Sequence, residues 1–366
     1  MADGALPLDA LPVAARMTEA TPAVAMPGAA LPGRMLRREP AFYAALDLGT
    51  NNCRLLVGAP TQNGFRVVDS FSRIVRLGEG LAATGRLSEA AMDRAMEALA
   101  ACADKLGRRR LRGFSAVATE ACRRATNGPE FLTRVALETG ITPRIIGGRE
   151  EAQLALASCA PLLTHGDRRA ILFDIGGGST EIAWVRLAPP GSPGSEPILS
   201  GTISIPVGVV TLAERPGESC FTREGFEAVR DEVAEKLRAF DAVHCIGQEI
   251  RQGGVRLIGT SGTVTTLAGT VLDLPRYRRQ WVDGVCLEAE EADAALEKLF
   301  AMGREGLANH PCIGPERADF VLPGCAVYAA IRQVWPVQRL TVADRGLREG
   351  MLLKLIQADR AMGRWG

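Results

Sequence analysis

A short pattern that occurs twice constrains the fold of this chain more than any other feature. Residues 43–57, YAALDLGTNNCRLLV, contain an apolar strand, an aspartate, a glycine-containing turn and a returning strand, and residues 170–185, AILFDIGGGSTEIAWV, repeat this layout. The two copies align through Asp47 and Asp174, which are 127 positions apart. Because a lone hairpin cannot cover its own apolar face, the duplication predicts two related domains, each built around one such hairpin.

Around these hairpins the chain alternates between strand and helix patterns. Ser88 is a favourable N-cap before an amphipathic helix, a later helix is expected to start after Thr222, and Gly140 is expected to end a third. The segment FSAVATEACRRA, residues 114–125, reads as a strand followed by a loop. This alternation favours an α/β fold with two domains that face one another.

Composition sets off the tail, and the repeated strand–helix layout divides the rest of the chain into two domains. We predict a disordered Ala/Pro-rich tail at residues 1–40, a first domain at 41–155 completed by a closing helix at 345–366, and a second domain at 156–344. No apolar run reaches about 18 residues, so we expect no membrane-spanning helix and no membrane partner.

Charge and cysteine content exclude several classes of protein. The formal net charge of +1 at pH 7 argues against a nucleic-acid-binding protein. The nine cysteines include no C-x-x-C pair, which argues against a zinc site or a disulfide framework and favours the cytoplasm. The sequence leaves a homodimer open.

The glycine-rich turn after Asp174 has two carboxylates at its ends. It is not a P-loop, because no G-K-[ST] follows, and it is not a dinucleotide fingerprint, because a strand follows instead of a helix. A hairpin tip remains, whose backbone N–H groups can approach an anion closely. Since phosphate is commonly bound together with Mg²⁺, Asp174 and Glu181 predict a magnesium site, and Asp47 is expected to contact its bound water. The simpler alternative is a tight turn with two surface acids.

Six segments in order resemble one family. They are Asp47–Asn51 (DLGTN), ATEACRRATNG, GGREEAQLA, FDIGGGSTEI, GTSGTVTTLA and GLREGML. Together they span residues 43–353 and resemble the exopolyphosphatase/guanosine pentaphosphate phosphohydrolase (Ppx/GppA) family of the actin/Hsp70/sugar-kinase superfamily.

The resemblance implies a fold, a reaction and residue roles. The fold would be two ribonuclease H-like (actin-like ATPase) domains facing across a cleft. The reaction would be Mg²⁺-dependent hydrolysis of a terminal phosphoanhydride, with inorganic polyphosphate as the leading substrate and pppGpp as the alternative. Glu151 matches the general base and Arg123 the phosphate-contacting arginine, while Asp174 and Glu181 match the carboxylates associated with the metal. The expected phosphate-binding residues are Gly49, Thr50, Asn51, Gly176, Gly177, Gly178, Ser179, Thr180, Ser261, Gly262 and Thr263.

Other interpretations stay open at this point. Glu150 and Glu151 could be first-turn acids that stabilise a helix, and Arg124 could replace Arg123. Ser261–Thr263 could pack the second domain, and the arginine clusters at 108–113 and 276–281 could either guide a long polyanion or form solvated surface. A more distant functional alternative is an actin-like ATP-binding switch or kinase.

Overall fold

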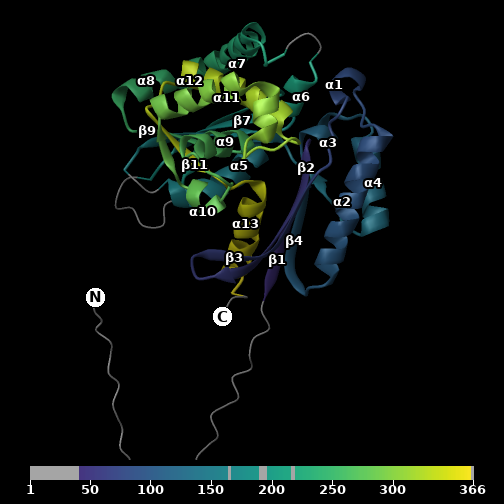
Figure 1. The fold of residues 1–366 in the computed structure, drawn as a ribbon. Helices are drawn as coiled ribbons and strands as arrows, with labels where there is room; N and C mark the ends of the chain where they lie inside the picture. Colours follow the sequence, from purple (N-terminus) through teal and green to yellow (C-terminus); the bar gives the residue numbers. More distant parts are fainter. Residues whose placement is uncertain (1–40, 164–165, 189–195, 216–218, 364–366) are drawn as a thin grey trace, which may run out of the picture. The chain divides into compact units, whose positions relative to one another are not determined.

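The structure of the chain is a computed structural model that describes residues 41–163, 166–188, 196–215 and 219–363. The predicted tail at residues 1–40 lies outside the described residues. The described residues, from Ala41 onward, form one compact unit with two β-sheets and helices on their faces (Figure 1). This is the α/β architecture that the alternating pattern predicts.

The first sheet has five strands in the order β3-β2-β1-β4-β5. Its strands are β1 (Phe42–Leu48), β2 (Asn52–Thr61), β3 (Gly64–Ile74), β4 (Leu111–Ala118) and β5 (Arg144–Ile145). Its helices are α1 (Leu81–Thr84), α2 (Glu89–Gly107), α3 (Glu120–Arg124) and α4 (Gly128–Thr139), followed by α5 (Gly148–Cys159) and the short η1 (Ala160–Leu162). The last helix, α13 (Leu347–Ala361), returns to this sheet and lies beside β1 (Figure 1).

The second sheet has six strands in the order β10-β11-β9-β6-β7-β8. Its strands are β6 (Arg169–Ile175), β7 (Thr180–Arg186), β8 (Ile198–Ile205), β9 (Val255–Thr260), β10 (Cys286–Glu288) and β11 (Arg339–Ala343). Its helices are α6 (Val209–Ala213), α7 (Arg223–His244), α8 (Ile246–Gln252), α9 (Gly262–Val271), α10 (Arg279–Val282), α11 (Ala289–Asn309) and α12 (Ala318–Val334).

Strand alternation places apolar side chains on both faces of each sheet. In β1, Ala44, Leu46 and Leu48 pack with α2 and α4, whereas Tyr43 and Ala45 pack with α5 and α13. Because successive side chains of a strand point to opposite faces, one continuous apolar run supplies two cores. The central strand β6 does the same between the helices α7, α9, α11 and α12 on one face and α5 on the other.

Helix α5 contacts the cores of both sheets. Leu154 belongs to the core of the first sheet, and Ala152, Ala155 and Leu156 belong to a core of the second. The predicted domain division after residue 155 therefore falls inside a helix, and the division itself stays a prediction.

The two hairpins are equivalent residue by residue. In the first hairpin, Asp47 lies opposite Arg54 in the register of the two strands, and the amide of Gly49 donates to the carbonyl of Asn52. In the second hairpin, Asp174 lies opposite Glu181 in the same way, and the amide of Gly176 donates to the carbonyl of Ser179. The structure thus confirms the internal repeat in its expected alignment. Among the described residues, no helix is long and apolar enough to cross a membrane.

Candidate active site

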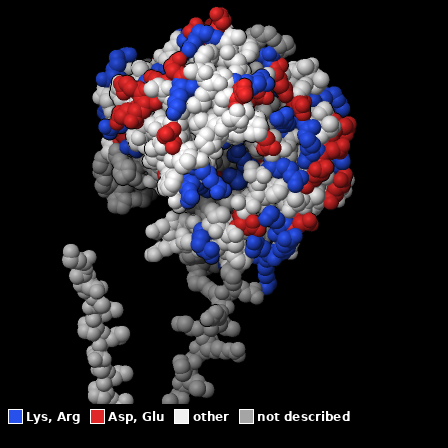
Figure 2. All heavy atoms as spheres, viewed as in Figure 1, with Lys and Arg blue, Asp and Glu red and all other residues white. Residues whose placement is uncertain are grey.

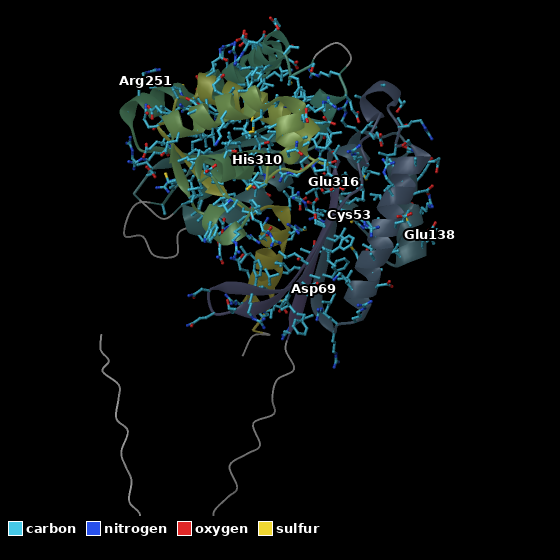
Figure 3. The ribbon with its side chains drawn as sticks, viewed as in Figure 1. Cys53, Asp69, Glu138, Arg251, His310 and Glu316 are labelled. Carbon is cyan, nitrogen blue, oxygen red and sulfur yellow. The ribbon has the colours of Figure 1, made fainter. Side chains whose placement is uncertain are left out.

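A cavity of about 730 Å³ lies where the two hairpin tips meet. Its walls come from the carboxyl ends of parallel strands in both sheets, which is where ligands bind in open α/β sheets. Figure 2 shows a hollow near the middle of the view with blue side chains in and around it, and Figure 3 labels Glu316, which lines the cavity. The predicted site residues that line it are Asp47, Gly49, Thr50, Asn51, Glu151, Asp174, Gly176, Gly177, Gly178, Ser179, Glu181, Ser261, Gly262 and Thr263.

The tips of the two hairpins touch. A Cβ atom on Gly178 would lie 2.6 Å from Oγ1 of Thr50, and one on Gly177 would lie 3.2 Å from Cβ of Asn51. Neither glycine has a left-handed backbone conformation, so close approach, rather than conformation, explains the need for glycine at both positions. The glycine loop of one sheet is therefore packed directly against the Gly-Thr-Asn turn of the other.

Asp47 and Asp174 occupy equivalent positions and are half-buried at the cavity. Burial raises the pKa of Asp174 to about 6 against the opposing charge of Arg54, and the charge of Asp47 adds to the rise. Burial also raises the pKa of Asp47, opposed by Arg54 and Arg348. The Oδ1 atom of Asp47 is buried and has no hydrogen-bond partner among the described residues. Leaving a buried carboxylate oxygen unpaired is costly, which indicates that it serves a ligand.

Glu181 lies opposite Asp174 and on the same face of the β6–β7 hairpin. The hydroxyl groups of Ser179 and Ser204 donate to its Oε1 atom at 2.7 and 2.8 Å. Burial raises the pKa of Glu181 to about 8, and the charges of Glu151 and Asp174 add to the rise. Thr180 does not line the cavity, because its buried hydroxyl donates to the carbonyl of Val207 at 2.7 Å.

Glu151 is in the first turn of α5 and points into the same cavity. Its position depends on close contacts of α5 with its neighbours: a Cβ on Gly148 would lie 2.4 Å from Cβ of Ser204, and one on Gly350 of α13 would lie 2.1 Å from the carbonyl oxygen of Leu154. Burial raises the pKa of Glu151 to about 7 against the hydrogen bond and charge of Arg123. A carboxylate that titrates near neutral pH is suited to act as a general base.

Arg123 lies behind Glu151 and outside the lining of the cavity. Its Nη1 atom donates to Oε1 of Glu151 at 2.6 Å and to the carbonyl of Ile146. Its Nη2 atom donates to Oε2 of Glu120. The structure therefore shows Arg123 bound by protein acceptors, and its predicted contact with phosphate stays a prediction.

Ser261, Gly262 and Thr263 form the start of α9, at the end of β9. Ser261 has a φ of 106°, a conformation that non-glycine residues rarely adopt, and its hydroxyl accepts a hydrogen bond from the Thr263 amide. The positive end of this helix faces the cavity, as anion sites often require.

The sequence analysis missed five arginines that line the cavity, and three of them, Arg54, Arg317 and Arg348, differ from the others in their partners. Among the described residues, none of the three has a carboxylate within ion-pair distance. Arg54 could have been found from the sequence, because in the alignment of the two hairpins it occupies the position of Glu181, the same number of residues after the hairpin aspartate. Arg317 comes from the start of α12 and Arg348 from the first turn of α13, which no local pattern connects to the site.

The two arginine clusters of the sequence differ in their surroundings. In the 108–113 cluster, Arg109 pairs with Asp69 and Arg112 with Asp359, away from the cavity lining. In the 276–281 cluster, Tyr277 and Arg279 line the cavity. The second cluster is therefore part of the site, and the first is a paired surface.

The carboxylates of the cavity supply some of the oxygen ligands that a hard cation such as Mg²⁺ needs. Among the described residues, no group of three or more His, Cys, Asp or Glu side chains is arranged to enclose an ion. Mg²⁺ commonly keeps several waters and uses one or two carboxylates, so a full protein cage is not required. The unpaired Oδ1 of Asp47 and the carboxylates of Asp174 and Glu181 supply the oxygen donors that Mg²⁺ prefers.

The chain is similar to known proteins in both sequence and fold. A Haemophilus influenzae protein provisionally named an exopolyphosphatase is 27% identical over 317 residues, covering 85% of this chain and 90% of its own length. The crystal structure of the Aquifex aeolicus Ppx/GppA family member matches with a TM-score of 0.71 and 25% identity, over 88% of this chain and 99% of that one. An exopolyphosphatase-like protein of known structure matches with a TM-score of 0.75 and 27% identity, over 87% and 98%.

These likenesses confirm the predicted fold of two actin-like halves. The model of the Ppx/GppA phosphatase family matches residues 56–359, which contain both sheets except β1 and the start of β2. The chain therefore belongs to the Ppx/GppA phosphatase family.

Proposed function

We propose that this phosphatase is an exopolyphosphatase that hydrolyses the terminal phosphoanhydride of inorganic polyphosphate. The observation that carries the proposal is the division of charge within one cavity. Two buried carboxylates, Glu151 and Glu181, and two half-buried ones, Asp47 and Asp174, gather around the hairpin tips. Guanidinium groups without carboxylate partners form other parts of the wall, and such groups bind phosphate well.

The lining favours a phosphate chain over a nucleotide. Among the described lining residues, the aromatic side chains are Tyr277 and Phe320. The hydroxyl of Tyr277 donates to Asp344, and the guanidinium of Arg76 lies 5.9 Å from the centre of the Phe320 ring. Because the described lining has only these two aromatic side chains and several arginines, we infer that the arginines provide the main recognition along the cavity. Hydrolysis of pppGpp is the alternative activity.

The reaction needs a positioned water and neutralised phosphate charge. In the proposed mechanism, Glu151 Oε2 accepts the proton of the attacking water, since Oε1 is already bonded to Arg123. The backbone N–H groups of Gly177 and Gly178 and the start of α9 bind the terminal phosphate. Arg54 and Arg348 bind phosphate oxygens and offset the negative charge that develops on the leaving chain.

The carboxylates would hold one Mg²⁺ ion through Asp174 and Glu181, with Asp47 contacting its bound water. When bound, the ion would neutralise charge on the phosphate oxygens. We also propose a cytoplasmic location, which is supported by the absence of any disulfide among the nine cysteines, all within the described residues.

Phosphate release from polyphosphate of defined lengths, pppGpp and ATP, with and without Mg²⁺, tests the proposal directly. We expect Mg²⁺-dependent release that is fastest with polyphosphate. Preference for pppGpp would replace the substrate within the family, and preference for ATP would contradict the exopolyphosphatase assignment.

The variant Glu151→Gln tests the base. It preserves shape and removes basicity, so turnover is expected to fall by at least about 10²–10⁴-fold while polyphosphate binding persists. The matched control is Glu150→Gln, since Glu150 pairs with Arg144 at the surface. Near-normal turnover of Glu151→Gln would show that another group takes the proton.

A further inference from the structure

Glu120 has a buried carboxylate at the cavity. Neither the internal repeat nor the proposed reaction gives this residue a role. It is the first residue of the five-residue helix α3 and retains only 7% of its exposure. It lines the cavity together with the hairpin tips. A glutamate in this position must be held by a partner, because a buried unpaired carboxylate would be costly.

The nearest partner of Glu120 is Arg123, the arginine that holds the base; Nε of Arg124 lies farther away, 3.8 Å from Oε1 of Glu120. Nη2 of Arg123 donates to Oε2 of Glu120, while Nη1 of the same guanidinium donates to Oε1 of Glu151 at 2.6 Å. The carbonyl of Ile146 accepts from Nη1 as well. Because the guanidinium is planar, these acceptors together fix its orientation, and it cannot rotate without losing one of them.

Glu120 also contacts the glycine loop of the other sheet. A Cβ atom on Gly178 would lie 2.9 Å from Cγ and 3.2 Å from Cβ of Glu120. The side chain is thus packed between the loop that is proposed to bind phosphate and the arginine behind the base. Any shift of the loop against α3 would move the Glu120 carboxylate.

We propose that Glu120 is a positioning residue: it holds the Arg123 guanidinium so that Arg123 fixes the Glu151 carboxylate beside the phosphate-binding loop. Glu120 does not touch the reacting atoms in this scheme. It connects the alignment of the base with the placement of the glycine loop. This inference rests on the proposed function, because it assigns Glu151 the role of base.

The test compares Glu120→Gln and Glu120→Asp with the wild-type full-length chain. Both variants disturb the hold on Arg123, so kcat is expected to fall by about 10- to 100-fold with KM changed by less than about 3-fold. Glu120→Gln also releases Arg123, whose hydrogen bond and charge lower the pKa of Glu151, so the acid limb of its kcat–pH profile is expected to move to higher pH. Glu120→Asp keeps a carboxylate that can still bind Arg123, and its acid limb is expected to shift less.

The matched control is Glu150→Gln, which makes the same chemical change next to the base without touching Arg123. It is expected to leave kcat, KM and the pH profile unchanged. Crystal structures of the variants give a readout that does not need activity. We expect the Arg123 guanidinium to leave its wild-type position in Glu120→Gln and to keep it in Glu150→Gln.

The outcomes separate this inference from the proposed function. A wild-type protein that hydrolyses no phosphoanhydride would contradict the function, and the crystal structures would still decide whether Glu120 holds Arg123. A Glu120→Gln variant with wild-type kcat, an unshifted acid limb and an unmoved Arg123 would overturn the inference while the function stands. Thermal unfolding of each variant identifies any loss of kcat that comes from unfolding.

Discussion

Replacement of Gly178 by alanine tests whether the contact between the two hairpin tips controls the site. The new Cβ would lie 2.6 Å from Oγ1 of Thr50 and 2.9 Å from Cγ of Glu120, both closer than real Cβ atoms approach. The backbone of Gly178 is not left-handed, so alanine introduces a steric clash without conformational strain. Overpacking of this kind costs about 1–3 kcal/mol of folding free energy.

The clash is expected to affect activity more than stability. The tips must separate to admit a methyl group, and a displacement near 1 Å at a reacting centre can cost about 10²-fold in rate. We expect kcat/KM for polyphosphate to fall by that order in Gly178→Ala, as measured by phosphate release. Gly177→Ala is the graded comparison, because its Cβ would meet Thr50 and Asn51 at 3.2 Å, and its loss should be smaller.

A double-mutant cycle identifies the contact. Thr50→Ala removes the Oγ1 atom that the new methyl group would meet. Gly178→Ala should therefore lower the free energy of unfolding by about 1 kcal/mol less in the Thr50→Ala variant than in the wild-type chain. Thr50→Ser keeps Oγ1 and should give no such relief. Additive effects in the Thr50→Ala cycle, or wild-type activity of Gly178→Ala, would refute the conclusion that the two tips touch.

Two further predictions concern charge in the cavity. In EDTA, the thermal stability is expected to fall as pH rises from about 5 to 8. The pKa values of Asp174, Glu151 and Glu181 in the folded chain are about 6, 7 and 8, whereas the unfolded chain releases these protons at lower pH. Saturating Mg²⁺ should flatten this dependence, and a flat profile in EDTA would contradict the raised pKa values of these carboxylates. Arg348→Gln is expected to raise KM for polyphosphate by about 10- to 100-fold with a smaller change in kcat, since charged hydrogen bonds contribute about 1.5–3 kcal/mol. The control is Arg339→Gln, which removes a surface ion pair with Glu288 and should leave KM unchanged.

Local signals in the sequence predicted the helix ends and the hairpins correctly. The hydroxyls of Ser88 and Thr222 accept the expected capping bonds, and Gly140 ends α4 in a left-handed conformation. These features depend on residues close together in the chain, where sequence patterns are most informative.

Features that depend on tertiary contacts were missed. Residues 120–124 were predicted as a loop, and the structure places the short helix α3 there. One turn is too short to show helical periodicity, and this one is supported by the Glu120–Arg123 pair and by packing against α4. Arg317 and Arg348 reach the cavity from distant helices, so only the folded chain brings them to the hairpins.

The helix α13, which covers one face of the first sheet, is synthesised long after the strands beneath it. Tyr43 in the first strand donates to Asp359 in α13 at 2.6 Å, across 316 residues of chain. At ordinary rates of translation, the ribosome needs roughly 15–60 s to make that intervening length. For all of that time the Tyr43 face of β1 has no α13 to cover it, so the nascent N-terminal part is expected to need protection from aggregation until α13 has been made.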